Sequence, residues 1–114
     1  MGESILQSIK KVLGAESMLD DFDTDLKMHI NTTLMILRQL GIGPSTGFSI
    51  HGSEETWSDF LGDDEPMLEM VKSYVAMKVR MIFDPPVGGA LDALKTTISE
   101  LEWRLNVAVD PVRW

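Results

Sequence analysis

The two histidines are the side chains in this sequence best suited to bind a metal ion or to act as a general base. Asp25 precedes His29 by four positions, and Glu54 and Glu55 follow His51 by three and four. Such spacings place two ligands on one face of a helix, but a metal site needs a third or fourth ligand, and no further imidazole is present. We therefore predict no metal site, and we interpret both histidines as solvated residues beside acids.

Residues 21–25 (DFDTD) carry acids at alternate positions, as the start of a calcium-binding loop does. In such a loop the sixth position is glycine and the twelfth is a bidentate glutamate. Here those two positions hold Leu26 and Thr32. We therefore interpret the acids as a helix start, where they suit the positive end of the helix dipole.

The sequence also lacks the residues that nucleophilic catalysis and phosphate binding need. The chain has no cysteine, which excludes thiol catalysis, thiolate zinc sites and disulfides, and which fits a reducing compartment. No nucleophile, base and orienting group form a recognisable set. Residues 87–89 (VGG) lack the lysine and the preceding strand of a phosphate loop. The sequence therefore predicts no enzyme, no catalytic residue and no cofactor.

The composition predicts a single acidic domain over residues 1–114. Apolar residues make up 44%, which argues against intrinsic disorder, and the length is near that of one domain. Eighteen acidic and ten basic residues give a net charge of −8, which argues against sequence-independent binding to nucleic acid. The longest apolar runs, such as residues 34–37, fall far short of the ~20 residues of a membrane span, so no membrane association is expected.

Hydrophobic periodicity predicts an all-α fold, a small bundle of four main helices. A loop rich in Gly, Ser, Thr and Pro separates the second helix from the third at residues 41–65. Connections of this length inside a compact domain often carry function. The predicted helices cover about residues 3–13, 19 or 25 to 40, 66–83 and 89–107.

The third predicted helix is apolar on nearly all sides. A helix of this kind is surrounded by protein, either in its own domain or at a subunit interface. Three short partners in one small domain do not readily provide that cover. We therefore expect neighbouring copies of the chain to complete the burial of this helix.

All three tryptophans lie outside the regular apolar pattern. Trp57 precedes Phe60 by three positions, so one helical turn at residues 56–61 presents them together, by default as a satellite core over one end of the bundle. Trp103 lies off the leucine seam of the fourth helix. Trp114 follows a helix-breaking proline, and we interpret it either as docking on another subunit or as the end of a mobile tail.

Four segments together resemble the small head–tail connector (adaptor) proteins of tailed bacteriophages. They are TWSDFL (residues 56–61), MVKSYVAMKVR (70–80), FDPP (83–86) and ELEWRL (100–105). The opening of the chain, a short helix, a glycine and an acidic second helix, is similar too. The FDPP stop and the ELEWRL seam are the specific parts of the resemblance.

The resemblance implies an all-helical structural subunit without a catalytic site, in the neck of the virion and assembled in the host cytoplasm. Such subunits form a homo-oligomeric ring, usually of twelve copies, beneath the portal protein. The ring binds the portal on one side and the next connector, a stopper or a tail protein on the other. It extends the channel through which DNA leaves without being specifically bound, and a net negative charge suits such a conduit.

Within this interpretation, two groups of residues are the candidate partner-binding sites. For docking on the portal we select the C-terminal stretch at residues 109–114, in particular Val112, Arg113 and Trp114. For contacts between subunits or with the downstream protein we select apolar residues in or near the loop, namely Phe48, Ile50, Trp57 and Phe60.

A second hypothesis comes from the acidic stretch around the loop. Residues 54–69 contain seven acids and no Lys or Arg. This stretch is typical of a solvated surface, but it also suits a basic partner. The alternative function is therefore a small acidic phage-encoded regulatory protein, a DNA mimic that inhibits a basic host protein as a monomer or dimer.

Overall fold

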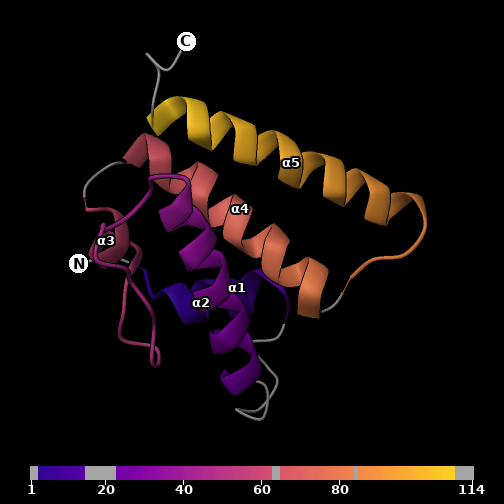
Figure 1. The fold of residues 1–114 in the computed structure, drawn as a ribbon. Helices are drawn as coiled ribbons and strands as arrows, with labels where there is room; N and C mark the ends of the chain where they lie inside the picture. Colours follow the sequence, from indigo (N-terminus) through magenta and orange to yellow (C-terminus); the bar gives the residue numbers. More distant parts are fainter. Residues whose placement is uncertain (1–2, 15–22, 63–64, 84, 110–114) are drawn as a thin grey trace.

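A computed structural model gives the structure of the protein and describes residues 3–14, 23–62, 65–83 and 85–109 (Figure 1). Over these residues the fold is all-α, and four of the five helices have seven residues or more, as predicted. The described residues contain no strand, and the loop falls between the second and third helices. The helices are α1 (Ile5–Val12), α2 (Asp23–Gln39), α3 (Trp57–Leu61), α4 (Glu65–Phe83) and α5 (Gly89–Val109).

Local capping explains where the short helices begin. The Ser4 side chain accepts a hydrogen bond from the backbone N–H of Gln7 at 3.2 Å and starts α1. Thr56 and Asp59 form a capping box at the start of α3, where each side chain accepts from the other residue's backbone N–H. Each cap satisfies N–H groups that have no partner inside the helix. The short turn at residues 57–61 therefore begins at the Thr56 cap.

Helix α4 is the central helix and packs against each of the other four (Figure 1). Val71, Tyr74, Val75 and Val79 are fully buried within the subunit. The subunit itself therefore buries the middle of this helix, where α1, α2, α3 and α5 enclose it, and the contribution expected from neighbouring copies stays a prediction for the rest of the helix. Only near its C-terminal end does a large apolar side chain, Ile82, remain 47% exposed.

A polar contact fastens α5 along α4. The Tyr74 hydroxyl donates to Oε2 of Glu102 at 2.6 Å, and Nζ of Lys78 lies 3.6 Å from the same oxygen. Burial of the ring, together with the bond to Glu102, raises the pKa of Tyr74, so the hydroxyl stays protonated and acts as the donor. This contact fixes the register between the two helices.

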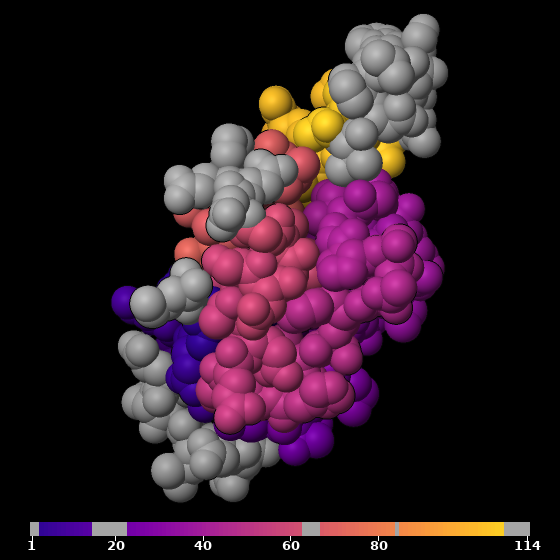
Figure 2. Space-filling model, turned by 90° about the vertical axis from the view of Figure 1, so that its left-hand side faces the viewer, coloured from indigo at the N-terminus to yellow at the C-terminus, as the bar shows by residue number. Residues whose placement is uncertain are grey.

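Hydrogen bonds fix the long loop to α2 at Ile50 and to the start of α1 near Glu55. The side chain of Asn31 on α2 pairs with the backbone of Ile50, donating to its carbonyl at 3.0 Å and accepting from its N–H at 2.7 Å. Near α1, Ile5 N–H donates to the carbonyl of Glu55 at 3.0 Å, and Trp57 N–H donates to that of Glu3 at 3.1 Å. The space-filling view shows the loop and α3 as a broad cover on this side of the molecule (Figure 2).

Gly43 allows the turn after α2 to lie against Phe60. Its φ is +88°, and a Cβ there would lie 2.8 Å from Cζ of Phe60 and closer still to Cε1. We expect Gly43→Ala to lower the free energy of unfolding by about 2–4 kcal/mol, because it adds a steric overlap to the strain of a positive φ. Gly47→Ala is the matched control, since Gly47 has φ +97° but open space around it. Equal losses in urea unfolding of the two variants would contradict the overlap with Phe60.

Candidate functional site

Two of the acids considered for chemistry, Asp23 and Glu55, have structural partners in the fold. Asp23 pairs with the buried ammonium of Lys10 at 2.8 Å, while Asp25 lies exposed in the first turn of α2. The Glu55 carboxylate accepts from the backbone N–H groups of His51, at 3.0 Å, and Gly52, at 3.4 Å. Partial burial raises the pKa of Glu55, but these hydrogen bonds outweigh it and the net pKa is lowered. In the described part of the chain no three His, Cys, Asp or Glu residues gather as metal ligands would.

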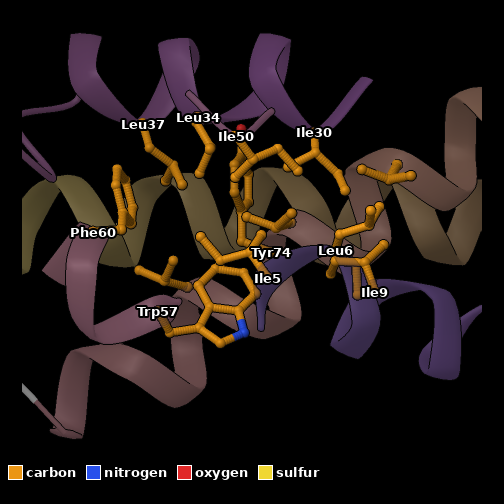
Figure 3. Packing of buried hydrophobic residues seen from close by; sticks show 14 of the residues in the cluster. Ile5, Leu6, Ile9, Ile30, Leu34, Leu37, Ile50, Trp57, Phe60 and Tyr74 are labelled. Atoms are coloured by element: carbon orange, nitrogen blue, oxygen red, sulfur yellow. The ribbon is translucent and has the colours of Figure 1, made fainter. Parts of the chain in front are cut away.

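Three of the four loop candidates are core residues. Ile50, Trp57 and Phe60 are 1%, 2% and 4% exposed, and their side chains point into the cluster between α1, α2 and α4 (Figure 3). The indole N–H of Trp57 donates to Oγ of Ser8 at 2.9 Å. These three side chains offer no surface to a partner because the loop is folded back onto the helices and buries them.

The fourth loop candidate, Phe48, is half-buried. Its ring stacks at a tilt on that of Phe60, with centroids 5.3 Å apart. Of the C-terminal candidates, Val109 is the last residue of α5, and Val112, Arg113 and Trp114 lie outside the described residues. Phe48 is therefore the one loop candidate with partial access to a partner.

Large apolar side chains lie exposed on several helices, and the bulkiest of them were not among the candidate residues. Met28 and Met35 on α2 are each 58% exposed, and Trp103 on α5 is 64% exposed. The sequence carried the signal for all three, because Met28 and Met35 are seven positions apart, opposite the buried stripe of α2, and Trp103 lies off the seam of α5. Exposed aromatic and methionine side chains at helical spacing are typical of contact surfaces.

These residues define two surfaces that are used below. Each consists of exposed residues at steps of three and four along one helix. The outer face of α2 comprises Asp25, Met28, Thr32, Met35 and Gln39. The outer face of α5 comprises Asp92, Thr96, Ser99 and Trp103.

The acidic surface is present in the described residues as well. Glu54, Asp59 and Glu69 are exposed on the loop, α3 and α4. Nearby, Lys72 is engaged with Glu3 at 2.6 Å. Within the described segments, no helix has both the length and the apolar character needed to cross a membrane.

A comparison with protein families identifies the family of this all-α chain. The model of a family described as "Phage connector protein" matches residues 5–112, nearly the whole chain. Neither the curated proteins nor the solved structures give a match. The chain therefore belongs to the phage connector protein family, which implies a structural, non-enzymatic role at the junction of phage head and tail.

Proposed function

We propose that the protein is a head–tail adaptor that assembles as a ring of twelve copies beneath the portal protein, in the neck of the virion. The ring binds the portal on one side and a downstream connector, stopper or tail protein on the other, and assembly takes place in the host cytoplasm. The observation that carries this proposal is the family match over residues 5–112. The net charge of −8 on each chain suits a channel through which DNA passes without being bound.

The surface of the subunit supports assembly into a ring rather than a pair. Exposed apolar side chains lie on several helices, and two separate patches among them are Met28 with Met35 on α2 and Trp103 on α5. A closed ring needs two distinct contact patches on each copy, whereas a two-fold dimer needs only one. Two separate patches on one subunit are what a head-to-tail ring requires.

The proposal is tested by the mass of the purified protein over a range of concentrations, with and without the portal protein, and by images of the particles. Rings, or assembly that depends on the portal, support the adaptor. A monomer or dimer that does not bind the portal contradicts the adaptor proposal. If that species binds a basic host protein through Glu54, Asp59 and Glu69, the inhibitor hypothesis is favoured instead.

The C-terminal stretch is the proposed attachment to the portal. We expect Trp114→Ala to weaken portal binding about tenfold, because a tryptophan anchor carries a large share of a small interface. Thermal unfolding of the variant should match that of the parent protein. Arg113→Ala and Val112→Ala should have smaller effects in the same binding assay. Unchanged portal binding by Trp114→Ala would remove that residue from the site.

A further inference from the structure

We propose that the outer face of α2 on one copy packs antiparallel on the outer face of α5 of the next copy. This inference rests on the proposed ring and names the two surfaces that form it. Both helices bury their other side in the subunit, through Leu26, Ile30 and Leu37 on α2 and through Ile98 and Leu105 on α5. The two outer faces are therefore free for a partner.

The charges on the two helices match in one direction only. Asp25 and Arg38 are exposed thirteen positions apart on α2, about 20 Å along the helix, and Asp92 and Arg104 are exposed twelve apart on α5, about 18 Å. An antiparallel alignment places Asp25 opposite Arg104 and Arg38 opposite Asp92. A parallel alignment places like charges together at both ends, so it is disfavoured.

The remaining charges on these surfaces allow the same alignment. On α5, Glu100 lies 3.7 Å from Arg104, and antiparallel packing brings it level with His29 of α2. Lys27 points away toward the loop, where its ammonium donates to the carbonyl of His51. Lys95 lies on the flank of α5, level with Met35, and adds one cation within a turn of Arg38. Arg38 also holds the loop, because its Nε donates to the carbonyl of Ser45 at 2.9 Å, and its exposed guanidinium reaches Asp92 from there. The two end contacts favour the antiparallel direction.

The apolar side chains also complement each other in this alignment. Trp103 falls within one turn of Met28, and contact between a methionine sulfur and an aromatic ring is favourable. Met35 falls beside the small residue Thr96, and Thr32 falls between Thr96 and Ser99. Large side chains thus meet small ones, as close helix packing requires.

Packing of α2 on α5 is favoured over a self-paired dimer because it covers both outer faces, with Met28, Met35 and Trp103 among them. An antiparallel pair of α5 helices also brings Asp92 opposite Arg104, but it leaves Met28 and Met35 uncovered. A pair of α2 helices leaves Trp103 uncovered. Packing α2 on α5 covers both faces of each copy and continues from copy to copy.

The experiment exchanges the charges on one face at a time. The first variant carries Asp25→Arg and Arg38→Asp, the second carries Asp92→Arg and Arg104→Asp, and the third carries all four. Each variant keeps the net charge of the chain, so differences in assembly between the variants reflect only the positions of the charges. Sedimentation velocity over a concentration series, with the portal added where assembly needs it, measures the concentration of half-assembly.

We expect each one-face exchange to raise the concentration of half-assembly at least about tenfold, because two attractive contacts become repulsive. The four-substitution variant should return to within about threefold of the parent protein. This recovery also excludes misfolding as the cause of the first two losses. If the four-substitution chain loses helical circular dichroism, the smaller set Asp25→Arg, Arg104→Asp and their combination repeats the test at one contact.

Each other outcome contradicts the inference in a recognisable way. If exchange on α5 alone leaves assembly unchanged, the α5 helices pair with themselves or take no part. If exchange on α2 alone leaves assembly unchanged, the α2 helices pair with themselves or the copies associate through another surface. Rings that form normally in both cases overturn the α2–α5 contact and leave the adaptor proposal standing. A parent protein that stays monomeric even with the portal overturns both.

Discussion

Trp57→Ala should lower the free energy of unfolding by about 3–5 kcal/mol, the cost of removing a large buried aromatic side chain. Trp57 is 2% exposed and is the largest of the fully buried side chains. Its indole N–H donates to Oγ of Ser8 at 2.9 Å, so the substitution also leaves that oxygen without its donor. Single domains unfold at a cost of about 5–15 kcal/mol, so the variant should be marginally stable.

Two controls separate the parts of this effect. Trp57→Phe keeps most of the buried ring but loses the hydrogen bond to Ser8, so about 1–2 kcal/mol of loss is expected. Substitution of an exposed tryptophan, Trp103→Ala, should change stability by less than about 0.5 kcal/mol. Urea unfolding followed by circular dichroism measures all three. A loss below about 1 kcal/mol for Trp57→Ala would mean that the loop does not fold onto α1 as described.

The default interpretation of Trp57 and Phe60 as core residues is confirmed, since both are buried, but the place of Trp57 against α1 was not predictable from local pattern. Its spacing from Phe60 correctly indicated a short helical turn. What places the turn in the core is a contact between distant parts of the chain, the backbone pairing of Ile5 with Glu55. Periodicity reports which residues share a face of one element, but not which distant segment covers that face.

For the central helix α4, too, the apolar pattern did not show which segment covers the helix. Its apolar residues on nearly all sides correctly indicated that protein surrounds it, and its C-terminal end at Phe83 was predicted to the residue. The pattern left open whether that protein is the same chain or a neighbour. For the middle of the helix the structure resolves this in favour of the same chain, since Val71, Tyr74 and Val79 are fully buried, while Ile82 near the C-terminal end stays 47% exposed. The case for assembly therefore depends on the outer faces of α2 and α5.

Trp103→Ala should weaken ring assembly at least about thirtyfold while leaving the fold intact. The side chain is 64% exposed in the free subunit, so its removal leaves no cavity. In the proposed contact it lies against Met28 of the next copy, and burying an aromatic anchor at the centre of an interface contributes about 2 kcal/mol or more. Because every copy in a ring makes this contact, the loss recurs at each interface.

Val87→Ala is the matched control for this prediction. Val87 is 84% exposed in the linker between α4 and α5 and lies on neither outer face. If exposure of apolar surface alone drove association, removing either side chain would weaken assembly. We expect the sedimentation of Val87→Ala to match the parent protein and that of Trp103→Ala to shift toward monomer. Met28→Ala should shift it in the same direction, and combining it with Trp103→Ala should add little, because both substitutions remove one contact. Additive losses for that pair would place the two side chains in separate interfaces.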